Sequence, residues 1–188
     1  MIGYAFCGSF CTLSRSLAAM KELIDSGYEI LPIVSENVYA YDTRFFNAHD
    51  FIDSVEELTG KKVIHTIVDA EPLGPKIKLD ALVIAPCSGN TLAKMALGIT
   101  DTSVSMAAKA HLRADRPTLI ALASNDSMSS NLKNIGTVLM RKNVYFTPML
   151  QDDPEKKPHS LVADFTKIPE CLSLTLEGRQ MRPLFISK

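Results

Sequence analysis

Residues 79–91 read LDALVIAPCSGNT, and their pattern is the clearest indication of the fold class in this sequence. Its five consecutive apolar residues at 81–85 predict a strand that is buried on both faces, as in a parallel sheet covered by helices. The chain then turns through residues 86–91 and enters a predicted helix. In a parallel sheet such a loop lies at the carboxyl edge, where ligands of these folds bind.

The loop itself is made of small polar residues, Ser88, Gly89, Asn90 and Thr91. Free backbone N–H groups and the positive end of a helix dipole suit a phosphate or another anion at this position. The alternative is an ordinary helix cap, in which Ser88 or Asn90 accepts from the first turn and Gly89 permits the turn. A second loop of the same kind favours the ligand site.

That second loop contains Gly8 and Ser9, between a predicted strand at 2–6 and a helix with an apolar stripe. The chain returns as a strand over 29–34 that stops at Ser35. Residues 2–34 thus form a strand–loop–helix–strand unit, in which Gly8 and Ser9 stand where a mononucleotide phosphate would lie. Only Gly8 matches the three-glycine dinucleotide fingerprint, so we do not expect a nicotinamide dinucleotide held here in the usual way.

Strands and helices alternate along the rest of the chain, which predicts an α/β fold with a parallel sheet between helices. The region 1–150 forms the predicted domain, and the charged, proline-bearing segment that begins the tail 151–188 is a candidate lid. Within the tail, residues 160–166 and 169–176 are expected to add helical turns that pack on the domain or on a neighbouring subunit. The expected strands are 2–6, 29–34, 61–67, 79–85, 118–123 and 144–147.

The composition argues against several classes of function for this chain. The 188 residues are 46% hydrophobic and 22% charged with a formal net charge of −1, so one soluble domain is expected and no nucleic acid or membrane partner. No signal peptide or spanning segment is recognised, and a cytoplasmic location is expected. The four cysteines and four histidines lack the spacing of a metal site, so no metal is expected.

Three motifs together resemble the flavoprotein family. They are the loop after the first strand, the Ala-Pro-x-Ser-x-Asn-Thr motif at 85–91, and Gly-Ile-Thr-Asp at 98–101. This family includes flavin-containing cysteine decarboxylases, phosphopantothenoylcysteine decarboxylases and prenyl-flavin synthases, and the resemblance covers residues 1–150. It implies a three-layer αβα Rossmann-like sandwich whose six-stranded parallel sheet has the order 3-2-1-4-5-6.

The resemblance also implies an FMN pocket at the sheet edge, often completed by a neighbouring subunit, and hence a homo-oligomer. Short hydroxyls and backbone N–H groups would form its cradle. The candidate cofactor-binding residues are Gly8, Ser9, Ser35, Ser88, Gly89, Asn90, Thr91, Ser124 and Asn125.

Two departures from the family pattern bear on the chemistry. The decarboxylases carry a catalytic histidine eight residues before the aspartate that opens the fourth strand, and here that position is Pro72. Their Pro-Ala-Met-Asn loop after the fifth strand is replaced by residues 123–126. Cysteinyl decarboxylation is therefore not expected.

The segment 69–75 and the strand end at 124–126 resemble a subgroup of the family. This resemblance implies a protein that acts with a partner during sporulation to oxidise a cyclic dicarboxylate, with NADP brought by the partner or with a flavin on this chain that mediates the transfer. Arg15 and Lys94 are the candidate cations for the substrate carboxylates, and the catalytic residues stay unassigned. A flavin-dependent decarboxylase or prenyltransferase-like enzyme, and a non-catalytic scaffold, remain as alternatives.

Overall fold

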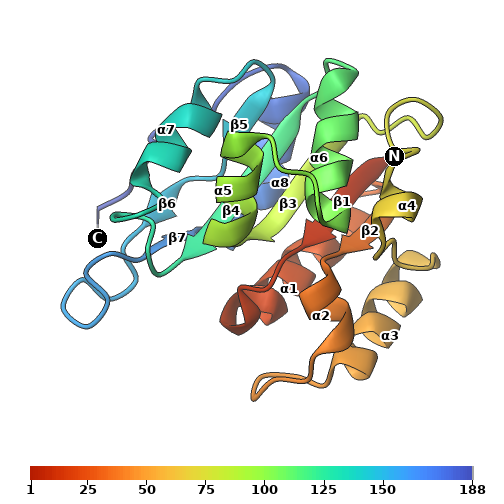
Figure 1. The fold of residues 1–188 in the computed structure, drawn as a ribbon, viewed down its shortest axis with the longest axis horizontal. Coiled ribbons are helices and arrows are strands. Elements are labelled where there is room, and N and C mark those ends of the chain that lie inside the picture. Colours follow the sequence, from red (N-terminus) through yellow and green to blue (C-terminus); the bar gives the residue numbers. More distant parts are fainter. Residues whose placement is uncertain (188) are drawn as a thin grey trace.

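A mainly parallel sheet between two layers of helices forms the centre of the computed structural model, which describes residues 1–187 (Figure 1). Its five parallel strands lie in the order β2-β1-β3-β4-β5. Strands β1, β2 and β3 are buried along most of their length because helices cover both faces of the sheet. The bounds are β1 (Ile2–Phe6), β2 (Ile30–Val34), β3 (Ala81–Cys87), β4 (Thr118–Ser124) and β5 (Val144–Phe146).

Helices divide between the two faces of the sheet. In Figure 1, α5, α6 and α7 lie in front of the sheet and α8 lies behind it. Two separate apolar cores result, one on each face. The first face carries α1 (Leu13–Asp25), α3 (Ala48–Thr59) and α8 (Ile168–Leu176), and the second carries α4 (Ile67–Ala70), α5 (Gly89–Leu97), α6 (Ser103–Arg113) and α7 (Leu132–Leu139).

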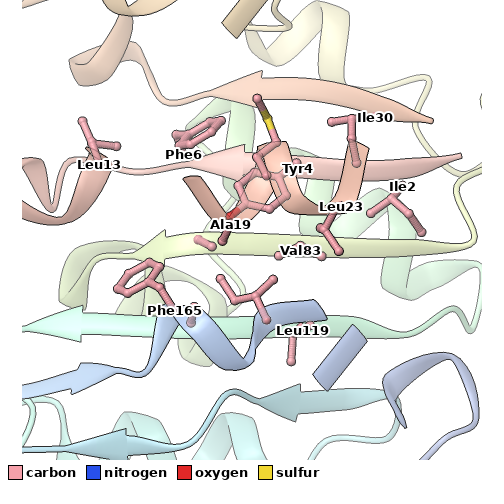
Figure 2. Close-up of a cluster of buried hydrophobic side chains, with 14 of the residues drawn as sticks. Ile2, Tyr4, Phe6, Leu13, Ala19, Leu23, Ile30, Val83, Leu119 and Phe165 are labelled. Carbon is pink, nitrogen blue, oxygen red and sulfur yellow. The ribbon is translucent and has the colours of Figure 1, made fainter. Parts of the chain in front are cut away.

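The alternation of side chains along β1 illustrates how the two cores are filled. Tyr4 and Phe6 point into the first core, as Figure 2 shows, whereas Ala5 belongs to the second. The Tyr4 hydroxyl is fully buried and donates to the backbone oxygen of Ser16 at 3.0 Å, and Ser16 Oγ donates to the Ala85 oxygen at 2.5 Å. This chain of hydrogen bonds joins β1, α1 and β3.

Local signals set the helix ends. Asn47 caps α3 by accepting from the N–H groups of its first turn, and Gly60 ends α3 with φ of 65°. Gly98 ends α5 in the same left-handed conformation, with φ of 74°. The short helix α2 (Glu36–Ala40) follows β2 directly and was not expected from the sequence.

The expected order of parallel strands is confirmed, but the expected third strand, at 61–67, is reduced to one bridge. Ile64 pairs with Ile33 beside β2, and the chain then enters α4 at Ile67. The hydroxyl of Thr66 accepts from Asp69 N–H and so caps α4, which ends the extended segment.

The sheet has seven strands rather than six, because two short strands follow β5, one at the end of the predicted domain and one in the tail, and the two are antiparallel to each other. These are β6 (Met149–Leu150) and β7 (Leu161–Ala163), and β7 pairs with the end of β4 through Ala123 and Val162. The expectation of helical turns over 160–166 is therefore wrong for its first half. The region 165–167 is a 3-10 helix that leads into α8.

The tail packs on the domain of its own chain. Ile168, Cys171 and Leu172 of α8 are buried in the first core, and Phe165 lies in the same cluster. Within residues 1–187, no helix is both long and apolar enough to cross a membrane. The same residues contain no group of three or more His, Cys, Asp or Glu side chains that could hold a metal ion.

Candidate functional site

A cavity of about 360 Å³ lies at the carboxyl ends of β1, β2 and β3, and we call it the sheet-edge cavity. Gly8 follows β1, Ser35 follows β2 and Ser88 follows β3, so the segment after each strand contributes to the lining. Its volume lies in the range of about 300–1,000 Å³ that is usual for small-molecule sites. The lining residues are Gly8, Ser35, Glu36, Asn37, Ser88, Asn90, Thr91, Lys94, Asp101 and Thr102.

Hydrogen bonds hold the loops around this cavity together. Cys7 N–H donates to the Pro86 oxygen at 3.1 Å, and Thr91 Oγ1 donates to Cys7 Sγ at 3.3 Å. Ser35 N–H donates to the Phe6 oxygen at 2.9 Å. The structure thus brings together the loops after β1, β2 and β3, which correspond to the first, second and fourth strands expected from the sequence.

Ser35 carries the clearest sign of a ligand. Its Oγ is buried and has no hydrogen-bond partner among residues 1–187, although Ser35 stands at the N-cap position of α2. A buried hydroxyl without a partner costs free energy, and such groups in native proteins call for an explanation. A polar ligand atom in the sheet-edge cavity would supply the missing partner.

The charged groups of the cavity are already paired. The Lys94 ammonium lies 2.7 Å from the Asp101 carboxylate, and this hydrogen bond holds the pKa of Asp101 below its usual value. The Glu36 carboxylate accepts from the N–H of Ser103 at 2.7 Å. One cation and two carboxylates line the cavity, so its side chains provide no net positive charge, and the hydroxyl groups of the lining are its remaining polar side-chain donors apart from Asn37 and Asn90.

Two buried thiols lie at the strand ends beneath the cavity. Burial raises the pKa of Cys7 to about 11, and burial also raises the pKa of Cys87. Both thiols are therefore protonated at neutral pH, and a thiol in this state is a poor nucleophile. Their small size and their contacts with the loop fit a packing role.

Gly89 faces protein rather than the cavity. A β-carbon at this position would lie 2.5 Å from Ser124 Oγ and 2.7 Å from Asp126 Oδ1. Its φ is not positive, so the reason for glycine is this close approach and not the backbone conformation. Ser124 Oγ donates to Asp126 Oδ1 at 2.5 Å, and Asn131 Nδ2 donates to Asp126 Oδ2 at 2.8 Å.

Other candidate residues also lie outside the lining of the sheet-edge cavity. Asn125 is exposed, and the backbone oxygen of Ser9 accepts from Thr12 in the turn before α1. Arg15 lines a different cavity of about 460 Å³, where its guanidinium lies 5.5 Å from the centre of the Phe165 ring. Arg15 and Lys94 therefore do not meet around one small substrate.

Four lining residues were not among the expected site residues: Glu36, Asn37, Asp101 and Thr102. The first two belong to α2, which the sequence did not predict. Asp101 belongs to the Gly-Ile-Thr-Asp motif, and that motif was the signal that could have found it.

The fold and the cavity together define a Rossmann-like α/β protein with a small-molecule site at the carboxyl edge of its sheet. The family model described as Flavoprotein matches residues 1–169. The chain therefore belongs to the flavoprotein family, as the motifs predicted.

Individual relatives agree with this assignment. The B subunit of dipicolinate synthase from Bacillus subtilis (strain 168) is 40% identical over 185 residues, which are 98% of this chain and 92% of the relative. The crystal structure of the corresponding B subunit from Bacillus halodurans superposes with a TM-score of 0.91 at 38% identity, over 100% of this chain and 96% of that one. The FMN-dependent cysteine decarboxylase SpaF shares the fold, with a TM-score of 0.69 at 21% identity over 94% of each chain.

Proposed function

We propose that this chain is the B subunit of a dipicolinate synthase. It acts with the A subunit of that enzyme during sporulation to oxidise dihydrodipicolinate to dipicolinate with NAD(P). The observation that carries the proposal is the likeness to the B subunit of Bacillus subtilis, at 40% identity over 98% of this chain. Likeness over the whole length favours the same role, because it covers both the sheet-edge cavity and the tail.

The sheet-edge cavity supports a flavin, FMN, as the ligand of this chain. Gly8 leaves space at the end of β1, and the short hydroxyls of Ser35, Ser88 and Thr91 are suited to phosphate or ribityl oxygens. The unpartnered Ser35 Oγ fits such a ligand. Bound flavin would supply a hydride acceptor, and the residues of this chain would bind and orient it.

The proposed reaction removes a hydride and a proton from the dihydropyridine ring, which becomes an aromatic pyridine. The hydride passes to the oxidant, NAD(P), either directly or by way of the flavin, and the proton passes to a base. Cys7 and Cys87 are protonated thiols, and Pro72 has no titratable side chain, so none of these can serve as that base. The chain also lacks a full dinucleotide fingerprint. Both facts favour a site that is completed by the A subunit.

A surface suited to such a contact lies next to the cavity. Tyr39, Tyr41 and Phe45 are exposed by 42%, 61% and 51%, on α2 and on the loop that follows it. Exposed aromatic side chains in one segment are typical of protein interfaces. A stable contact with the A subunit would bury at least about 1,000 Å². A homo-oligomer also stays a prediction.

Reconstitution tests the proposed function. This chain and the A subunit are purified separately and assayed for dipicolinate absorbance, each alone and mixed, with NADP and with NAD. We expect turnover only in the mixture. Equal turnover by either protein alone would contradict the division of the reaction between two chains. A mixture with the Tyr41→Ser variant tests the contact, and a mixture with the Leu97→Ser variant, on a different surface, is the matched control.

A further inference from the structure

A second cavity, of about 480 Å³, lies on the other side of the 98–102 turn from the sheet-edge cavity, and we call it the basic cavity. The turn separates the two: Thr100 lines the basic cavity, whereas Asp101 and Thr102 line the sheet-edge cavity. The lining of the basic cavity comes from α5, the 98–102 turn, α6 and Arg141, which follows α7. Its lining consists of Met95, Gly98, Ile99, Thr100, Ser105, Ala108, Lys109, Leu112, Arg113 and Arg141.

All the charged side chains of this lining are positive. Lys109, Arg113 and Arg141 contribute three cations, and the lining contains no carboxylate. Among residues 1–187, none of the three has a carboxylate oxygen within 4.0 Å. The whole chain carries a formal net charge of only −1, so this concentration of positive charge is local.

The nearby carboxylates are already engaged. Asp115, just beyond α6, pairs with Lys142 at 2.5 Å, and Asp101 pairs with Lys94 at 2.7 Å. The cations of the basic cavity are therefore left without a counter-charge from the protein. An anion from solution can supply that counter-charge.

The three cations are exposed side chains that come from two segments of the chain. Lys109 and Arg113 are four residues apart on α6 and so lie on one face, where like charges repel. Arg113 stands in the last turn of α6, where a cation is favourable, but this does not account for Lys109 in the middle of the helix. Arg141 is fixed in place because its Nη2 donates to the Ala96 oxygen at 3.0 Å.

The rest of the lining is mainly apolar, with Thr100 and Ser105 as its polar side chains. Met95 is buried, and Ile99 and Leu112 add further apolar surface, which suits a ligand with an apolar body as well as negative charge. Guanidinium groups bind carboxylates in bidentate fashion, and two of them with an ammonium suit two carboxylates on one small ring. We propose that the basic cavity binds a compact cyclic dicarboxylate.

The choice of a dicarboxylate rests on the proposed function, whereas the cavity and its charges do not. The sheet-edge cavity has a single cation, Lys94, which Asp101 already neutralises. The basic cavity thus provides the cations that the sheet-edge cavity lacks.

Calorimetric titration of this chain alone, without the A subunit, tests the inference. The probes are pyridine-2,6-dicarboxylate, its mono-acid pyridine-2-carboxylate, and inorganic phosphate. We expect the dicarboxylate to bind best and its affinity to fall with rising salt. Arg113→Gln and Arg141→Gln should each weaken binding by about tenfold or more, because each removes a charge-assisted hydrogen bond. Lys133→Gln, at an exposed lysine of α7 outside the cavity, is the matched control and should bind like the wild type.

Three outcomes would overturn the inference: no binding of the dicarboxylate, phosphate binding as tightly, or binding that is lost with Lys94→Gln but kept in both arginine variants. The reconstitution assay is a separate measurement. Turnover in the mixture, together with no dicarboxylate binding to the basic cavity, would reject this inference and leave the proposed function intact. Dicarboxylate binding to the basic cavity without turnover in the mixture would reject the proposed function and leave this inference intact.

Discussion

Gly89 at the start of α5 lies so close to Ser124 at the end of β4 that a β-carbon on Gly89 would be 2.5 Å from Ser124 Oγ. The contact joins the loop after β3 to the polar cluster after β4, and it sets the position of the α5 N-terminus. Gly89 does not line the sheet-edge cavity, but it affects the shape of this cavity through the position of α5.

We predict that Gly89→Ala destabilises the protein by about 1–3 kcal/mol, because the added methyl group must displace Ser124 and Asp126. Urea unfolding followed by circular dichroism measures this change. Gly136→Ala is the control: it lies within α7 and nothing lies within 4 Å of its β-carbon position. That substitution should stabilise by about 0.5–1 kcal/mol. Equal effects of both substitutions would contradict the close contact.

Ser35→Ala should leave the unliganded protein as stable as the wild type or slightly more stable, because the buried hydroxyl has no partner to lose. The same substitution should weaken FMN binding by about tenfold, since a hydrogen bond to a charged group is worth about 1.5–3 kcal/mol. Flavin fluorescence titration measures the affinity.

Thr118→Val is the matched control for Ser35→Ala. Thr118 Oγ1 is also buried without a partner among the described residues, but it lies on β4 outside the sheet-edge cavity. This variant should gain stability and keep the wild-type affinity for FMN. If Ser35→Ala also keeps that affinity, the Ser35 hydroxyl does not touch the flavin.

Leu172→Ala should cost about 2–5 kcal/mol, because Leu172 is fully buried between α8 and the sheet. Leu176→Ala on the same helix should cost less than about 1 kcal/mol, since Leu176 is 40% exposed. A chain that ends at Gln151 lacks α8 and β7 altogether, and we expect it not to fold. Chemical unfolding of the two variants and the circular dichroism of the shortened chain are the measurements. A folded shortened chain would show that the tail is dispensable.

Stability should fall as the pH drops from 7 to 5, in part because of His111. Burial lowers the pKa of His111, although the Pro117 oxygen, 2.9 Å from Nε2, opposes this. A histidine with a lowered pKa in the folded state contributes stability above its unfolded pKa of about 6.5, and loses it as the pH falls toward the folded value. Protonation would place a second N–H, on Nδ1, where the described residues offer no partner.

His111→Gln keeps a side-chain donor for the Pro117 oxygen but removes the titration. The free energy of unfolding, measured by urea at each pH, should then depend less on pH between 7 and 5. His159→Gln, at an exposed histidine, is the control and should keep the wild-type dependence. An unchanged pH dependence in His111→Gln would rule out this contribution.

The sequence was sufficient to predict the parallel core of the fold. The apolar runs of β1, β3 and β4 are buried on both faces, so their patterns leave little choice of structure. The segment 61–67 has a similar pattern, yet it pairs only at Ile64, because Thr66 starts a helix. β7 was missed since its three residues pair with the end of β4, a long-range contact that no local pattern records.

The candidate site could be predicted in outline for a similar reason. Parallel strands end at the same edge, so Gly8, Ser35 and Ser88 had to approach one another. The sequence could not reveal that Gly89 faces Ser124, because that depends on how α5 packs against the end of β4. Nor could it place Arg15, whose helix α1 lies on the opposite face of the sheet from α5.

The proposed flavin site is tested most directly by the structure of a crystal of this chain that has been soaked with FMN. We expect flavin density in the sheet-edge cavity, with the phosphate or ribityl oxygens within hydrogen-bond distance of Ser35 and Ser88. Flavin bound elsewhere on the chain, or a sheet-edge cavity that stays empty at saturating FMN, would contradict this expectation.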